Sequence, residues 1–525
     1  METVNSEFFA YSKDIASRFL MSAIVVDDMA SFEKPDVDIT PKHLVAPSIA
    51  TITEGISTNG PDSGVSFDSH GLNAKEITDS FAKKGIFCSI LKPYKRDLPD
   101  IKKMTKALSV RSDVIIVDWV ILKEREPGQN ALAILKDISR DSAQLHLVII
   151  YTGAPELLEI SQKIKTMLGQ KAKVEDEGLT LIKGSIRICI YAKPDTKVIE
   201  SHKNRILLYE NLTEKVIEEF TKMTSGLVSN VALDSISQIR RNTPKVLETF
   251  SRELDPPYLT HRALQPDPAD AEHHLTSWVT QELNAVIEEA AVSQHVKMEA
   301  IEKWIKSRSP FKLSGKELDV TTLLRVGIND FPALSNKQKN NAHKNLTNVF
   351  AGGASSPNAD EKLARLSTIR SFYQAPMPYL TQGTIVERLD PKGNESSHYV
   401  CVQPRCDCVR LTTKRKFLFL PLKRVRDDGK FNMVIFHDDK FDRYFYEKDP
   451  YNLHIEAFKP LKSQNRITFK KDSSGNYILT ITKSKKFKWL AELRWDHSQR
   501  LSNELSGNLA RVGLDESEWL RRSAK

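Results

Sequence analysis

The sequence predicts a multidomain protein: an N-terminal α/β doubly wound domain, a middle α-helical region and a C-terminal β-rich module with a helical tail. Three observations predict this fold class. Apolar strand-like runs alternate with helical segments over the first 200 residues, helical periodicity dominates residues 205–350, and short strands separated by turns follow. A chain of 525 residues suits two to four domains. We expect the domains at residues 1–200, 205–370 and 371–525.

In the N-terminal domain, four apolar runs rich in β-branched residues are typical of strands buried on both faces of a parallel sheet. These runs are residues 23–28, 114–118, 145–152 and 186–194. A further strand is expected at 85–91, a charged hairpin at 171–184, and helices at 5–20, 73–84, 98–108, 129–139 and 155–168. Strands that alternate with helices predict a parallel sheet wound by right-handed crossovers.

The loop after the first strand is unusually long. Residues from about 30 to 71 are rich in Pro, Ser, Asp, Thr and Gly and show little periodicity. Such composition predicts a surface insertion without a packed core. A solvated insertion is favoured over a lid on a binding site.

Each of the four runs ends in a polar side chain, and the order is Asp27 with Asp28, then Asp118, Thr152 and Lys193. Because ligands bind at the carboxyl edge of open α/β sheets, we expect these groups to converge there. Clustered carboxylates repel one another unless a cation holds them, and hard oxygen ligands suit Mg²⁺. A carboxylate beside Mg²⁺ can form an acyl phosphate, whose oxygens a hydroxyl and an ammonium then hold.

This ordered set resembles the receiver domain of bacterial two-component response regulators over roughly residues 15–200, a flavodoxin-like fold. The resemblance implies that a histidine kinase or kinase-like ATPase phosphorylates the protein, and that there is no independent enzymatic activity. It implies the following roles: Asp118 as phosphoryl acceptor, Asp27, Asp28 and the backbone carbonyl of Val120 as Mg²⁺ ligands with Asp118, Thr152 as switch hydroxyl, and Lys193 as phosphate partner.

The sequence also departs from the receiver pattern. The spacing from Asp28 to Asp118 is about twice that expected of the family. The family has Met-Pro shortly after the acceptor and a Gly a few residues on, whereas here Trp119-Val-Ile-Leu-Lys follows Asp118 and precedes Pro127-Gly128. The alternative is therefore a phosphorylation-independent pseudo-receiver, acting as a scaffold or nucleic-acid-binding module. More loosely, a receiver with a bulky C-terminal extension is similar to proteins paired with kinase-like ATPases in bacterial antiviral defence.

Charge is unevenly distributed along the chain. Residues 401–525 hold 27 Lys or Arg against 16 Asp or Glu, which gives this segment a net charge of +11. The whole chain has a net charge of +9, so the first 400 residues carry −2. A basic module predicts binding to nucleic acid or to an acidic protein face. Aromatic residues interleave with its basic runs; these are Phe417, Phe419, Phe487 and Trp489. Such aromatic residues could stack on bases. The favoured interpretation is that they face the core while the lysines face water.

Composition also bounds the location. The apolar runs are too short to span a membrane, the N-terminus lacks the pattern of a secretory signal, and five cysteines without paired spacing indicate a reducing compartment. We expect a cytoplasmic protein without a membrane partner.

Two candidate features of the later chain remain. An apolar stripe with helical spacing predicts a packed bundle core in preference to a docking face; its members are Leu275, Trp278, Val279, Leu283, Val286 and Ile287. The residues Cys401, Cys406 and Cys408, with His398, do not have a usual zinc spacing, so buried thiols are favoured over zinc or a hydrolytic site at Cys406. We expect strands at 383–387, 399–403, 416–420, 431–436 and 477–482, and a helix at 490–520.

Overall fold

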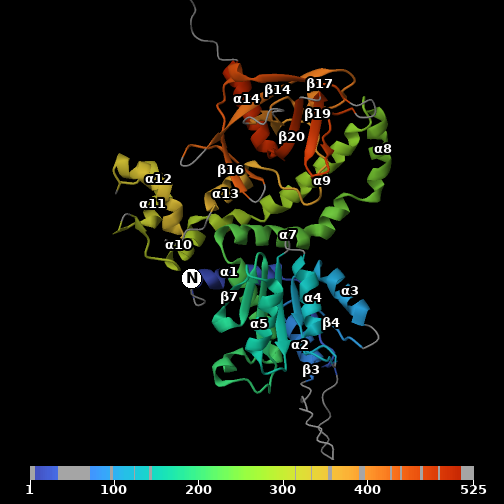
Figure 1. The fold of residues 1–525 in the computed structure, drawn as a ribbon, viewed down its shortest axis with the longest axis vertical. Coiled ribbons are helices and arrows are strands. Elements are labelled where there is room, and N and C mark those ends of the chain that lie inside the picture. The colour runs from blue at the N-terminus through green and yellow to red at the C-terminus, as the bar shows by residue number, and fades with distance from the viewer. Residues whose placement is uncertain are drawn as a thin grey trace, which may run out of the picture. The chain divides into compact units, whose positions relative to one another are not determined.

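The computed structural model describes residues 6–32, 71–94, 98–122, 124–140, 145–313, 315–332, 334–352, 358–389, 396–425, 429–437, 440–460, 465–482 and 485–509. The chain divides into two compact units (Figure 1). The first comprises Met1–Pro310 with Asp319–Phe331, and the second Phe311–Leu318 with Pro332–Lys525. The helices that follow residue 205 thus begin in the same unit as the N-terminal sheet, and the three-part division drawn from the sequence stays a prediction.

A seven-stranded sheet forms the centre of the first unit. Its order is β4 (Phe87–Leu91), β1 (Ser22–Val26), β5 (Val114–Val117), β6 (His146–Thr152), β9 (Ile186–Ala192), β8 (Thr180–Lys183) and β7 (Lys173–Glu175). The first five are parallel, and β8 and β7 extend the sheet as an antiparallel hairpin. The parallel strands have the flavodoxin-like order 2-1-3-4-5. The predicted parallel sheet and charged hairpin are confirmed.

Helices cover both faces of this sheet, which explains why its strands are apolar on both sides (Figure 1). The core on one face contains side chains of α1 (Glu7–Phe19), α2 (Ala74–Ala82) and α6 (Leu212–Thr224). The other core contains side chains of α3 (Leu98–Ser109), α4 (Gln129–Arg140) and α5 (Leu157–Leu168). Residues of β5 alternate between the two cores, with Val114 and Ile116 in the first and Ile115 and Val117 in the second.

Helix α6 belongs to this sheet domain, although the sequence placed it in the middle helical region. Val216, Ile217 and Phe220 are buried in the core on the sheet. The helix begins at Leu212, after a short 3₁₀ turn η3 (Tyr209–Asn211), so Leu208 does not join its apolar face and is exposed.

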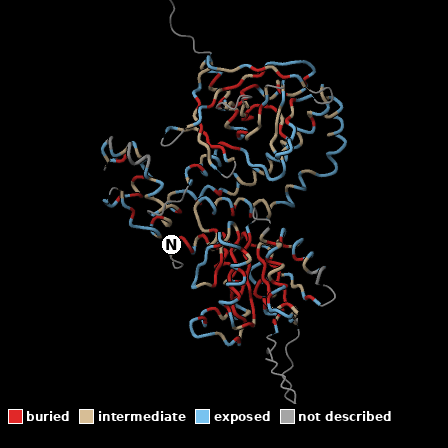
Figure 2. The backbone as a smooth tube through the Cα atoms, viewed as in Figure 1, coloured by how far each residue is buried: buried red, intermediate tan, exposed pale blue. Residues whose placement is uncertain are grey.

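The further helices of the first unit are α7 (Leu227–Thr249), α8 (Asp255–Leu264), α9 (Asp270–Glu289), α10 (Met298–Lys306) and α11 (Val320–Asp330). The predicted bundle core is wrong for α9, because no member of its apolar stripe is buried and Trp278 is 43% exposed. Within this unit α9 contacts α7 and α8, and Ala271 is its one buried residue. Figure 2 shows that the buried residues of the first unit are concentrated in its seven-stranded sheet.

The second unit contains a nine-stranded antiparallel sheet. Its order is β15 (Met433–His437), β16 (Lys440–Phe445), β14 (Arg415–Val425), β13 (Ser397–Cys401), β12 (Thr384–Leu389), β20 (Lys485–Glu492), β19 (Tyr477–Thr482) and β18 (Lys470–Lys471), with β17 (His454–Phe458) also paired to β14. The β-rich character is confirmed. The helix expected from residue 490 is wrong at its start, because residues 490–492 lie in β20 and α14 runs Trp495–Leu509.

Two cores stabilise this sheet. One joins residues of β12, β14 and β15 to Leu501 and Leu505 of α14, with α13 (Ala359–Thr368) contacting β15. The other is aromatic and contains Phe417, Phe419 and Phe487, which are at most 1% exposed. These three side chains therefore face the core, as favoured from the sequence, and cannot stack on bases. Trp489 is partly buried against the same core. The unit also includes α12 (Asn336–Phe350) and the hairpin of β10 (Lys312–Leu313) with β11 (Lys316–Glu317).

Most of the insertion expected at 30–71 lies outside the described residues. The two ends of the insertion meet, because β2 (Ala30–Ser31) pairs with β3 (Leu72–Asn73). Of the helices that the structure describes, none combines the length and apolar character needed to cross a membrane.

Candidate functional site

Three predicted site residues meet at the carboxyl edge of the parallel sheet. Asp27, Asp118 and Lys193 directly follow β1, β5 and β9. The Nζ atom of Lys193 lies 2.7 Å from Oδ2 of Asp27 and 2.6 Å from Oδ2 of Asp118. All three side chains are buried, with Lys193 only 1% exposed. The chain thus places one ammonium between two carboxylates in a site that excludes most water.

Burial and like charge dominate the electrostatics of this triad. Burial raises the pKa of Asp27 to about 7, the nearby Asp118 adds to the rise, and Lys193 opposes it. Burial acts to lower the pKa of Lys193, but Asp118 and Asp27 outweigh it and raise that pKa. Lys193 therefore remains an ammonium and offsets the repulsion between the carboxylates.

Asp28 lies beside the triad and is held by a different loop. Its Oδ2 accepts a hydrogen bond from the backbone N–H of Leu122 at 3.0 Å. Its Oδ1 is buried without a hydrogen-bond partner among the described residues. Burial raises the pKa of Asp28, and the bond from Leu122 opposes this. A buried carboxylate oxygen without a partner is costly unless a cation or water satisfies it.

The predicted switch hydroxyl lies at the same edge but is bonded within its own loop. Thr152 is fully buried, its Oγ1 accepts from the N–H of Ala154 at 3.1 Å, and its carbonyl accepts from the N–H of Lys193 at 2.8 Å. The N–H of Val120 donates to Oδ1 of Asp118 at 3.4 Å. Both carboxylate oxygens of Asp118 are thus engaged, while the roles of Thr152 and of the Val120 carbonyl stay predictions.

The residues present fit Mg²⁺ by the chemistry of their donors. Three carboxylates supply hard oxygen ligands, and Asp28 offers an oxygen that nothing else among the described residues satisfies. Within the described part of the chain, no three His, Cys, Asp or Glu side chains are already gathered as a metal-binding group. Lys193 explains this, because its ammonium lies between Asp27 and Asp118.

The loop after Asp118 is built around Trp119, which is 2% exposed and packs in the core shared with α4 and α5. Glu124 accepts the backbone N–H groups of Gln129 and Asn130 at 2.7 and 3.0 Å and so caps the start of α4. The side chain of Asn130 in turn donates to the carbonyl of Ile121 at 3.0 Å. The residues that depart from the receiver pattern near Asp118 therefore pack against the core of the sheet domain.

A second buried charged cluster was missed from the sequence. Glu219 of α6 accepts from Arg187 of β9 at 2.8 Å, from the hydroxyl of Tyr191 at 3.0 Å and from Lys222 at 2.7 Å. Although burial acts to raise it, Lys222 and Arg187 lower the pKa of Glu219 to about 2. Arg187 could have predicted this cluster from the sequence, because a charged side chain inside an otherwise apolar strand needs a buried partner.

The cysteine and histidine candidates separate in the structure. Cys401 and Cys408 are buried, and the thiol of Cys408 donates to the carbonyl of Pro404 at 3.3 Å, whereas Cys406 is exposed. His398 lies three residues before Cys401 on β13, so the two face opposite sides of the sheet. Nε2 of His261 lies 3.2 Å from Nδ1 of His274.

A parallel sheet in the order 2-1-3-4-5, with an acidic pair, a further carboxylate and a lysine at its carboxyl edge, is typical of the receiver class of signalling domain. In agreement, residues 19–198 match the family model described as a response receiver domain. The response receiver match covers residues 19–198, and the C-terminal part has no family match. No curated protein and no solved structure matches the chain. The family indicates a place in two-component signalling.

Proposed function

We propose that this protein relays a signal by accepting a phosphoryl group on Asp118 from a histidine kinase or kinase-like ATPase. The observation that carries the proposal is the buried contact of Lys193 with Asp118 and Asp27 at the carboxyl edge of the sheet. In the transfer, the bond from phosphorus to the donor nitrogen breaks as a bond to a carboxylate oxygen of Asp118 forms. The electron pair of the broken bond stays with the donor imidazole.

The residues around Asp118 have separate tasks in this proposal. Asp27, Asp28, Asp118 and the carbonyl of Val120 would hold Mg²⁺, which supplies charge neutralisation for the incoming phosphoryl group. Lys193 would shift from its pairing with Asp27 toward a phosphoryl oxygen, since a phosphoryl group carries more negative charge than the carboxylate. Thr152 would then exchange its bond from the Ala154 N–H for one donated to the phosphoryl group.

The output of such a switch is partner binding, without an enzymatic activity of its own. A phosphoryl group biases a two-state protein only through contacts that differ between the states. Lys193 and Thr152 are linked through β6 and β9, and β9 contacts α6 through Glu219. Bacterial antiviral defence is the setting we propose, by analogy with receivers that carry large C-terminal extensions.

The alternative is a phosphorylation-independent pseudo-receiver. The observation that favours it is that the ammonium of Lys193 already neutralises Asp27 and Asp118 without a metal or a phosphoryl group. Asp118 is also only 6% exposed. Treatment with acetyl phosphate and Mg²⁺ separates the two functions. A single phosphoryl adduct that is lost in Asp118→Asn and kept in Asp79→Asn, a surface control, supports the receiver function. An unmodified protein under conditions that label a known receiver supports the scaffold.

A further inference from the structure

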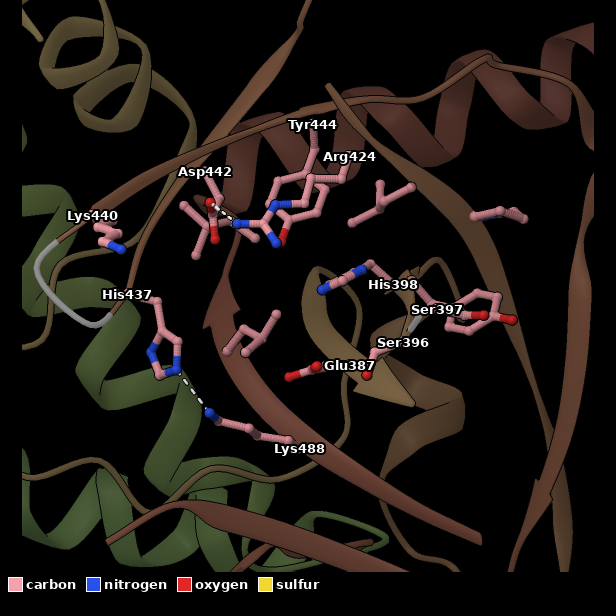
Figure 3. Close-up of a pocket in the computed structure, with 15 residues that line it drawn as sticks. Glu387, Ser396, Ser397, His398, Arg424, His437, Lys440, Asp442, Tyr444 and Lys488 are labelled. Carbon is pink, nitrogen blue, oxygen red and sulfur yellow. Dashed lines mark hydrogen bonds and ion pairs between the residues drawn. The ribbon is translucent and has the colours of Figure 1, made fainter. Parts of the chain in front are cut away.

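The β-sheet of the second unit contains a hollow that the sequence did not reveal. Its volume is about 1040 Å³, at the upper limit of the size range of small-ligand sites. Six strands contribute to its lining: β12, β13, β14, β15, β16 and β20. Figure 3 shows Glu387, His398, Arg424 and Lys488 around this hollow.

Strand register explains why these groups converge. Glu387 of β12 is paired with His398 of β13 on one side and with Lys488 of β20 on the other. Residues paired across neighbouring strands share a face of the sheet, so the three side chains form one row. Arg424 of β14 is paired with Tyr444 of β16 and extends the polar surface by a second row.

Cationic side chains from three strands, β14, β16 and β20, line the hollow. Arg424 is ion-paired with Asp442, and the ammonium of Lys488 donates to Nε2 of His437 at 2.7 Å (Figure 3). Lys440 and Lys488 form no ion pair with a carboxylate among the described residues. The bond to His437 fixes the direction of Lys488 without neutralising its charge, so the hollow offers two uncompensated ammonium groups and a guanidinium.

Glu387 provides the opposite chemistry. Its carboxylate points into the hollow in Figure 3 and makes no hydrogen bond or ion pair to a described residue. A carboxylate beside lysines discourages a simple anion but accepts hydrogen bonds from N–H donors. The hollow therefore suits a ligand with an anionic end and a donor-bearing end.

We propose that this hollow binds a nucleotide unit, with the phosphate at Lys440, Lys488 and Arg424 and the amino edge of the base at Glu387. Carboxylates accept bonds from exocyclic amino groups of bases, and Lys and Arg bind phosphates. An acidic peptide would use the cations but not Glu387. The proposal is independent of phosphorylation at Asp118 and stands on the second unit alone.

The test measures binding to the full-length protein. Calorimetry with CMP, AMP and GMP detects a free nucleotide, and anisotropy with fluorescein-labelled single-stranded RNA and DNA detects a nucleotide within a strand. Lys488→Ala and Lys440→Ala should each weaken binding about tenfold. Lys423→Ala is the matched control, because it removes the same charge from the neighbouring position of β14, where Lys423 faces Glu447 outside the hollow, and should change affinity less than about twofold.

Glu387→Gln gives the sharpest discrimination. It should weaken binding of the nucleotide probe about tenfold while strengthening binding of inorganic phosphate, because the lost carboxylate accepts from the base but repels a bare anion. Unchanged melting temperatures confirm that the variants fold. The proposal would be overturned if Glu387→Gln bound both probes more tightly, or if Lys423→Ala and Lys488→Ala lost affinity equally. It would also be overturned if a polyglutamate peptide bound in preference to every nucleotide probe, or if no probe bound.

Discussion

A Cβ atom placed on Gly128 would lie 2.0 Å from Cζ2 of Trp119, so the indole beside Asp118 requires glycine at the start of α4. The backbone of Gly128 also has a φ of +95°, a region that side chains rarely adopt. These two positions depart from the usual receiver sequence, and they do so as a complementary pair. The packing holds the loop from Asp118 to α4 against the core.

Gly128→Ala should destabilise the receiver by about 2–5 kcal/mol, from overpacking and from the positive φ. The overpacking part depends on Trp119. Chemical denaturation followed by far-ultraviolet circular dichroism should therefore show a smaller cost of Gly128→Ala in a Trp119→Ala background. Gly85→Ala is a control for positive φ without a nearby atom. Equal costs of Gly128→Ala in both backgrounds would show that the indole and Gly128 are not coupled.

Mg²⁺ should change the fluorescence of Trp119, because this buried indole directly follows Asp118. The chain has six tryptophans, so Trp119→Phe identifies the contribution of this one. We expect a saturable change in the wild-type protein that is lost in Trp119→Phe and in Asp118→Asn. A titration without any Mg²⁺-dependent change would count against the metal site.

Lys193→Ala should make stability depend on Mg²⁺. Removing the ammonium leaves Asp27 and Asp118 buried without their cation, which costs about 3–5 kcal/mol in the presence of a chelator. Added Mg²⁺ should recover much of this loss while the response to phosphodonor stays impaired. Thermal unfolding measures the effect, and Lys183→Ala is the control because Lys183 bonds a carbonyl, at 2.7 Å. A Lys193→Ala variant as stable as wild type in chelator would contradict the role of this contact.

Acid should destabilise the protein through Glu219. The pKa of Glu219 in the folded protein is about 2, below its ordinary value of 4.5, so the folded state favours the carboxylate. Its contribution is complete above about pH 4.5 and is lost as pH falls toward 2. Wild type should lose roughly 3 kcal/mol more than Glu219→Gln over that interval. Urea unfolding at each pH measures the slopes, exposed Glu210→Gln serves as control, and equal slopes for wild type and Glu219→Gln would refute the assignment.

The sheet edge was predictable because its signals are local. Runs such as Val114–Val117 are too apolar for anything but a doubly covered strand, and one polar residue ends each run. The parallel order then places Asp27, Asp118 and Lys193 together.

The features that were missed depend on tertiary contacts. The apolar stripe of α6 reads as any amphipathic helix, and only the structure assigns it to the sheet core. Trp119 and Gly128 are nine residues apart, and nothing in their spacing predicts contact. The hollow depends on the register of β12, β13 and β20, which a one-residue slip would destroy. Mixed basic and apolar residues also hid β20, which ends where a helix was expected.

Locating the phosphoryl group tests the central claim most directly. An acyl phosphate is reduced by borohydride, which converts the aspartate that carried it to homoserine, and peptide mass spectrometry then identifies the position. After treatment with acetyl phosphate and Mg²⁺, we predict homoserine at position 118 in the wild-type protein and none in Asp118→Asn. Homoserine at Asp27 or Asp28 in place of Asp118, or none anywhere when a known receiver is labelled in parallel, would contradict the proposed function.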